Sequence, residues 1–186
     1  EKMMEHNDNK LIILSRDGVI NADRGVVTHP DDWQAIEGSL EALARLRRAP
    51  FKVVVATNQP GLMRGASAVS YSNARHQKMH EQVKAAGGKI EAIFCCPHTA
   101  EVNCSCRKPS PEMLNDIAER FEVKLSEVVY VGDTFNDMMA AHNAGCHPYL
   151  VLTGQGSKAY ADGVLNDTHV RVNLAAVVRE LVGSGR

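Results

Sequence analysis

Four short polar segments of this chain carry side chains suited to binding a phosphate group and a hard metal ion. In chain order they read SRDG, TNQPG, CRKP and GDTFND. Asp17 and Asp133 offer carboxylate oxygens, which Mg²⁺ prefers as ligands. Thr57 and Asn58 offer hydroxyl and amide donors for phosphate oxygens, and Lys108 brings a positive charge. Together these residue types predict phosphate chemistry.

Two further side chains in the same segments extend this prediction. Arg107 adds a planar fork of donors beside the lysine, a geometry that matches a phosphate. Asp137 follows Asp133 by about one helical turn, so we expect it to orient metal-bound water. Each segment alone is typical of an ordinary turn or helix cap. Four of them, each following an apolar run or its loop, are hard to explain by turn chemistry alone.

The cysteines point to a second site. The chain has five cysteines, and four of them fall in one short stretch, whereas a disulfide framework spreads its cysteines through a small secreted chain. Cys96, His98, Cys104 and Cys106 form a Cys₃His set, which is typical of a closed, structural zinc site. Two alternatives remain open: thiols unrelated to the histidine, and Cys95 as a ligand in place of Cys96.

The composition is that of an ordinary globular protein. The 186 residues suit one domain over 1–186, with 44% hydrophobic and 23% charged residues. A net charge of -1 gives no reason to expect nucleic acid as a partner. The opening EKMMEHNDNK lacks a signal-peptide pattern, and no apolar run approaches the roughly 20 residues that span a bilayer. We therefore expect a cytoplasmic protein without a membrane partner, and a monomer.

Alternating apolar runs and helical patterns must position these side chains. The pattern predicts strands at 11–14, 52–57, 90–94, 128–133, 148–152 and 170–172, and helices near 39–46, 69–86, 111–121, 136–144 and 174–182. Strand–helix alternation predicts an α/β fold with a parallel sheet covered on both faces. Because the polar segments follow strands, we expect them to meet at the carboxyl edge of the sheet.

Local signals set the expected helix ends and loops. Ser39 and Ser110 are predicted N-caps, with Pro111 at the first helical position of its helix. Gly154 and Gly156 predict a loop after the fifth strand.

The segments SRDGVIN, VVVATNQPGLMRG, CPH…CSCRKPSPEM and VGDTFNDMMAA resemble the haloacid dehalogenase (HAD) superfamily. Within it, the chain is similar to the D-glycero-D-manno-heptose 1,7-bisphosphate 7-phosphatase and histidinol-phosphatase family, over residues 11–156. The resemblance implies a three-layer Rossmann-like fold with a zinc-binding loop and no large cap domain. It also implies Mg²⁺-dependent hydrolysis of a phosphomonoester on a sugar bisphosphate, in the supply of heptose for lipopolysaccharide.

The resemblance assigns roles to individual positions. It places Ser15 at the nucleophile position, Asp17 as the acid/base, and Thr57 and Lys108 on the phosphoryl group. Mg²⁺ would be held by Asp133, the main-chain carbonyl of Asp17 and the residue at position 15. Substrate contacts are expected at Asp23, Arg24, Gly25, Val26, Asn58, Gln59, Pro60, Arg64, Arg107 and Thr134.

Ser15 stands where the family carries an aspartate. A serine has no charge to hold Mg²⁺, and its hydroxyl is a poor nucleophile without a base. We therefore predict a folded chain that binds phosphate ligands and hydrolyses them very slowly. Ser15 is either an introduced substitution or a natural divergence. Three functions stay open: an impaired heptose-bisphosphate phosphatase, a non-catalytic phospholigand-binding relative, and a histidinol-phosphate phosphatase.

Overall fold

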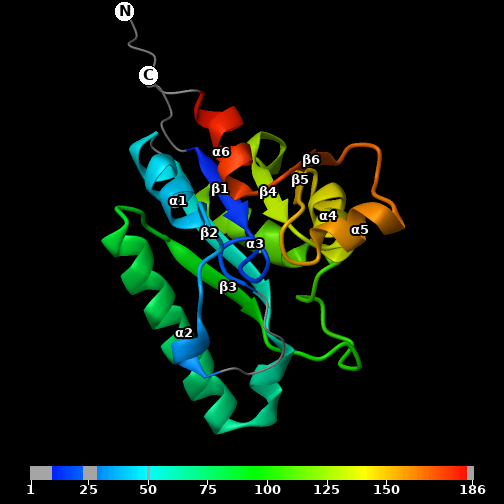
Figure 1. The fold of residues 1–186 in the computed structure, drawn as a ribbon. Helices are drawn as coiled ribbons and strands as arrows, with labels where there is room; N and C mark the ends of the chain where they lie inside the picture. The colour runs from blue at the N-terminus through cyan, green and yellow to red at the C-terminus, as the bar shows by residue number, and fades with distance from the viewer. Residues whose placement is uncertain (1–9, 23–28, 50, 184–186) are drawn as a thin grey trace, which may run out of the picture.

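Six parallel strands form one sheet in the order β3-β2-β1-β4-β5-β6. The computed structural model describes residues 10–22, 29–49 and 51–183, and its ribbon is drawn in Figure 1. The strands are β1 (Leu11–Leu14), β2 (Lys52–Asn58), β3 (Ala92–Cys96), β4 (Val129–Gly132), β5 (His147–Val151) and β6 (His169–Arg171).

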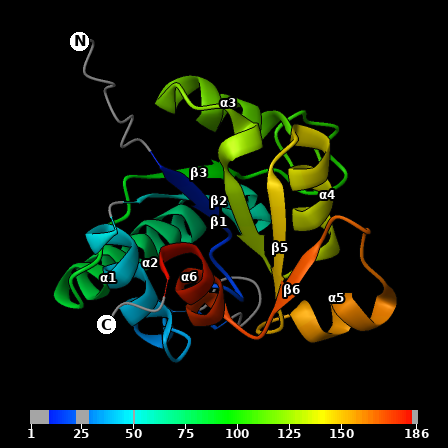
Figure 2. The same cartoon turned by 90° about the horizontal axis from the view of Figure 1, so that it is seen from above.

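Helices cover both faces of the sheet, as Figure 2 shows. One face carries α1 (Ser39–Arg48), α2 (Ala66–Ala85) and α6 (Leu174–Val182), and the other carries α3 (Glu112–Phe121) and α4 (Phe135–Ala144). The short α5 (Gly156–Asp162) follows β5, and the 3-10 turns are η1 (Pro30–Asp32), η2 (Pro60–Arg64) and η3 (Leu125–Glu127). The predicted three-layer α/β fold with a parallel sheet is confirmed. Among the described helices, none is both long and apolar enough to cross a membrane.

The central strand β1 is buried on both faces, which explains its unbroken apolar run. Ile12 and Leu14 pack under α1 and α6, while Leu11 and Ile13 pack under α3. Each such side chain contributes about 1.5–3 kcal/mol when it leaves water. Strands buried on both faces read as continuous rather than alternating apolar sequence. The core therefore fixes β1, and with it the polar turn that follows.

Two predicted N-caps were wrong. Helix α1 begins at Ser39, and Gly38 in a left-handed conformation takes the cap position. The buried Ser39 hydroxyl instead donates to the Val19 carbonyl at 2.8 Å, a tertiary contact that outweighs capping. Helix α3 begins at Glu112, after Pro111. Pro111 takes the cap position of α3, and Ser110 lies one residue before it. The Ser110 hydroxyl still accepts a hydrogen bond from the Glu112 amide at 3.3 Å.

Several element bounds also differ from the prediction. Strand β3 lies at Ala92–Cys96 rather than 90–94, because its register with β2 pairs Cys96 with Asn58. Helix α2 begins earlier, at Ala66. The residue Gly156, predicted to lie in a loop, begins helix α5, and the glycines at 154 and 156 made this segment look like a loop. The remaining strand ends differ by about one residue, which is the usual uncertainty of such boundaries.

The loops after β1, β4 and β5 touch at two glycines. A Cβ added to Gly18 (φ +78°) or to Gly154 (φ +55°) would overlap the carboxylate of Asp133. Thr153 Oγ1 also donates to the Gly18 carbonyl at 2.6 Å. Three separate strand ends are therefore packed without room for side chains at these positions.

This contact predicts that Gly18→Ala destabilises the fold more than Gly145→Ala. Both glycines have a positive φ, so alanine at either site costs about 1–2 kcal/mol of backbone strain. Nothing lies within 4 Å of the Cβ position at Gly145, whereas Gly18 meets Asp133 and should lose about 1–3 kcal/mol more. Urea unfolding of both variants measures the difference. Equal losses would contradict the close packing.

Candidate active site

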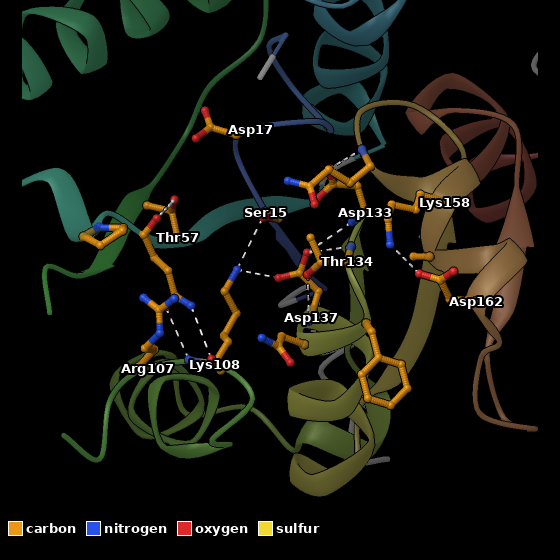
Figure 3. Close-up of a pocket in the computed structure, with 16 residues that line it drawn as sticks. Ser15, Asp17, Thr57, Arg107, Lys108, Asp133, Thr134, Asp137, Lys158 and Asp162 are labelled. Atoms are coloured by element: carbon orange, nitrogen blue, oxygen red, sulfur yellow. Dashed lines mark hydrogen bonds and ion pairs between the residues drawn. The ribbon is translucent and has the colours of Figure 1, made fainter. Parts of the chain in front are cut away.

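A cavity of about 470 Å³ opens at the carboxyl edge of the sheet (Figure 3). Asp17, Thr57, Lys108 and Asp133 all line it. These side chains come from four segments that are far apart in the sequence, and they meet at the carboxyl edge of the sheet as predicted. Ser15 lines the cavity with them, directly after β1.

Lys108 is buried at the centre of this cavity wall, with 4% of its surface exposed. Its ammonium donates to Asp137 Oδ1 at 2.5 Å and to the Tyr130 hydroxyl at 2.9 Å. It also reaches the Ala56 carbonyl at 3.2 Å and Ser15 Oγ at 3.4 Å. The charge of Lys108 is thus held in one place by contacts from β2, β4 and α4.

Asp137 is buried, lines the cavity, and holds its neighbours through four side-chain hydrogen bonds. Its Oδ1 accepts hydrogen bonds from the Lys108 ammonium and the Tyr130 hydroxyl. Its Oδ2 accepts from the backbone amides of Asp133 at 3.1 Å and Thr134 at 3.3 Å. Burial raises the pKa of Asp137, but Lys108 and these hydrogen bonds more than offset it, so the pKa is lowered. The carboxylate fixes Lys108 and the start of α4, and Asp137 also lines the cavity. Its part in orienting metal-bound water stays a prediction.

Thr57 and Asn58 end β2 at the cavity. Thr57 is 3% exposed and accepts a hydrogen bond from Gln59 Nε2 at 2.7 Å. The Asn58 side chain bridges to the backbone of Lys108, donating to its carbonyl at 3.4 Å and accepting from its amide at 3.3 Å. Asn58 therefore ties the end of β2 to the loop that carries Lys108.

The predicted substrate contacts divide into three groups. Asn58, Pro60, Arg107 and Thr134 line the cavity, whereas Gln59 and the exposed Arg64 do not. Asp23, Arg24, Gly25 and Val26 lie outside the described residues. The cavity also has outer lining residues that no sequence pattern indicated: Phe135, Asn136, Gln155, Lys158, Ala159 and Asp162. Most of them belong to the unpredicted α5 region, where the four-residue spacing of Lys158 and Asp162, an ion pair at 2.6 Å, was the available signal.

Asp17 sits at the cavity within a group of positive side chains. Its Oδ1 accepts from Arg16 Nε at 3.0 Å, Arg16 Nη2 at 2.9 Å and Asn21 Nδ2 at 3.0 Å. Arg75 Nη2 lies 4.0 Å from the same oxygen. Burial raises the pKa of Asp17, but Arg16, Asn21 and Arg75 more than offset it, so the pKa lies below its ordinary value. The carboxyl is therefore ionised before any ligand binds.

The oxygen donors near Asp133 fit Mg²⁺ in type but carry little charge. Asp133 is 3% exposed, and its Oδ2 accepts from the Gln155 amide at 3.0 Å. Ser15 contributes a neutral hydroxyl where a second carboxylate would add charge. All of these donors are hard oxygens of the kind that Mg²⁺ selects. The site therefore suits Mg²⁺ chemically, with one carboxylate fewer than the resembled family provides.

The four predicted zinc ligands converge. The donor atoms of Cys96, His98, Cys104 and Cys106 lie within 4.8 Å of one another. The Cys96–Cys104 sulfurs are 3.7 Å apart and the Cys96–Cys106 sulfurs 2.9 Å apart. Two thiolates on one tetrahedral zinc would be about 3.8 Å apart, given Zn–S bonds of about 2.3 Å. The Cys96–Cys104 distance is close to this value, and the Cys96–Cys106 distance is shorter. Cys95 is not in the cluster, because neighbouring residues of a strand face opposite sides.

The loop of this cluster is joined to the cavity. Arg107 directly follows Cys106, and its Nη1 donates to the His98 carbonyl at 3.1 Å. Lys108 comes next and enters the buried ion pair. A rigid cluster would thus fix the stretch of chain that carries both cationic side chains.

Comparison with known proteins agrees with this geometry. The family model of haloacid dehalogenase-like hydrolases matches residues 1–145. The D-glycero-beta-D-manno-heptose-1,7-bisphosphate 7-phosphatase of Bordetella bronchiseptica is 50% identical over 175 residues, which cover 93% of this chain and 98% of the relative. The enzyme of the same name from Pseudomonas aeruginosa is 41% identical, covering 92% and 97%.

Solved structures give the same picture. The crystal structure of D,D-heptose 1,7-bisphosphate phosphatase from B. bronchiseptica, complexed with magnesium and phosphate, superposes with a TM-score of 0.89 at 48% identity. That match covers 95% of this chain and 99% of the neighbour. The family model spans most of the chain, and these relatives span more than nine-tenths of it. The chain therefore belongs to the haloacid dehalogenase-like hydrolase family.

Proposed function

We propose that this chain is a Mg²⁺-dependent phosphatase of the D-glycero-D-manno-heptose 1,7-bisphosphate 7-phosphatase type, impaired by Ser15. One observation carries the proposal: Asp17, Thr57, Lys108 and Asp133 line a single cavity. The names of the relatives supply the substrate class, a sugar bisphosphate. A cavity of about 470 Å³ is in the range that holds small-molecule ligands.

The side chains divide the reaction between them. Thr57 and Lys108 bind oxygens of the phosphoryl group, and Asp137 keeps the ammonium in place. Asp17, ionised in the free site, takes up a proton from water when the negatively charged substrate binds, gives it to the leaving oxygen and later takes one from the attacking water. Mg²⁺ would be held by Asp133, the main-chain carbonyl of Asp17 and the Ser15 hydroxyl. When bound, the ion offsets negative charge on the phosphoryl group.

Ser15 lacks what a serine nucleophile needs. Activation of a hydroxyl requires a neighbouring base that accepts its proton. Within residues 10–22, 29–49 and 51–183, the side chain hydrogen-bonded to Ser15 Oγ is Lys108, at 3.4 Å, and its charge is paired with Asp137. An ammonium donates a proton and accepts none. The hydroxyl therefore stays a weak nucleophile, and the proposal expects slow turnover.

Ser15→Asp should restore phosphate release from D-glycero-D-manno-heptose 1,7-bisphosphate in the presence of Mg²⁺. The carboxylate supplies both an attacking oxygen and a charged metal ligand. Loss of a covalent nucleophile costs roughly 10⁴–10⁶ in rate, so a gain of about 10⁴ is expected. Ser15→Asn is the matched control, because it has the same shape without the charge. A Ser15→Asp protein that releases phosphate from no sugar phosphate would refute the mechanism.

Ser15 also favours a second candidate function, a non-catalytic module that binds a phosphorylated ligand. Calorimetry with the sugar bisphosphate and Mg²⁺ should then show binding to the unmodified chain without phosphate release. Thr57→Val removes one donor at constant shape and should weaken binding roughly tenfold, the value of a buried hydrogen bond of about 1–1.5 kcal/mol. Rapid turnover by the unmodified chain would eliminate this candidate.

We further propose that the Cys₃His set binds one structural zinc ion. Metal analysis of the purified chain should give about one zinc per molecule. Cys106→Ser should lose the zinc and lower the melting temperature, because structural zinc contributes to folding stability. Cys95→Ser is the neighbouring control and should keep the metal, since Cys95 lies outside the cluster. Zinc retained by Cys106→Ser, or lost from Cys95→Ser, would show that the ligand set is wrong.

A further inference from the structure

The carboxylate of Asp17 is held by one oxygen. Among the described residues, every hydrogen-bond donor to this group reaches Oδ1: two from Arg16 and one from Asn21. Arg75 also approaches Oδ1, at 4.0 Å. These contacts leave Oδ2 as the oxygen that can exchange a proton with a ligand in the cavity, which Asp17 lines.

The guanidinium that holds Asp17 is itself fixed from helix α2. Arg16 is 1% exposed, and its Nη1 lies 2.6 Å from His76 Nε2. A guanidinium has no acceptor, so Nε2 must accept, and the imidazole must be neutral with its proton on Nδ1. His76 lies on α2, sixty positions from Arg16 in the chain. The contact therefore links the acid/base turn to the outer helical layer.

We propose that Arg16 and His76 are positioning residues for Asp17. The neutral imidazole orients Arg16, and Arg16 clamps Oδ1, so that Oδ2 alone faces the reacting groups. The inference rests on the proposed function, because it gives Asp17 the acid/base role. It adds two residues, one of them on α2, to which neither the motif nor the cavity lining assigns a part.

The surrounding charges are consistent with a neutral His76. Burial lowers the pKa of His76, and the charges of Arg16, His80 and Arg75 lower it further, to about 4, against the opposing effect of Asp17. A protonated imidazole would face the Arg16 cation at hydrogen-bond distance. It would also turn the acceptor into a donor and break the contact.

The test is a titration of Asp17 by ¹³C NMR of the full chain labelled in its aspartate carboxyls. Asp17→Asn identifies the signal. His76→Leu removes the acceptor, so Arg16 should lose its fixed orientation and the pKa of Asp17 should rise by roughly half a unit or more. His76→Gln is the matched control, because its amide oxygen replaces Nε2, and the pKa should stay near the parent value.

An unchanged Asp17 titration in folded His76→Leu would overturn the proposal. If His76→Leu fails to fold, Arg16→Lys keeps the charge while losing the two-point clamp. A merely electrostatic role predicts the parent titration for that variant, and the proposal predicts a shift. These readouts require no turnover. In the Ser15→Asp background, His76→Leu should also lower kcat with little change in KM, and His76→Gln should not. No activity in any Ser15→Asp chain would count against the proposed function, while the titration still decides the positioning role.

A neutral His76 has a second measurable consequence, in the pH dependence of folding. The unfolded imidazole takes up a proton below its ordinary pKa of 6.5, whereas the folded one stays neutral down to about 4. The unfolded chain therefore binds more protons in this window, and stability falls as the pH drops from 6.5 to 4. The parent should lose up to roughly a hundredfold more in its folding equilibrium constant than His76→Gln over this range. Parallel curves for the two proteins would show that His76 is protonated in the fold.

Discussion

The buried ion pair between Lys108 and Asp137 is the interaction on which the site depends. It joins the loop after β3 to the start of α4, and it gathers contacts from β2 and β4 around one ammonium. Removing one partner of such a pair leaves an uncompensated buried charge, which typically costs about 3–5 kcal/mol. The cation proposed to bind phosphate is therefore part of the frame of the fold, and its position follows from packing with Asp137, Tyr130 and Ala56.

The same loop is anchored at its other end by the Cys₃His set. Cys96 is the last residue of β3, buried in the core beneath α3, while Cys106 stands two residues before Lys108. A polar loop of this length would otherwise have few apolar contacts to hold it. The two anchors, one of thiols and one of opposite charges, confine Arg107 between them. Asn58 adds a third tie, from the end of β2 to the Lys108 backbone.

The sequence predicted what local patterns encode. Alternating apolar and helical patterns predicted the sheet and most helices. The polar segments that follow the strands predicted that Asp17, Thr57, Lys108 and Asp133 lie together. Ligand spacing predicted the Cys₃His cluster. The sequence could not predict contacts that only the folded chain creates. Ser39 was predicted to be an N-cap from its place before an apolar stripe. Its hydroxyl bonds to the Val19 carbonyl instead, a contact that the local sequence does not reveal. The pairing of Asp137 with Lys108, twenty-nine positions away, was likewise invisible in the sequence. The contact between Arg16 and His76 spans sixty positions and leaves no local signal.

The pairing of Lys108 with Asp137 also bears on how position 15 can vary. If a carboxylate at position 15 were the partner of the lysine, its loss would leave a buried charge unpaired and destabilise the fold. Here Asp137 pairs with the lysine while a neutral serine stands at position 15. Folding and turnover are thereby uncoupled at this residue. On the proposed function, exchange of an aspartate at position 15 for serine would therefore remove the nucleophile and leave the frame of the fold in place.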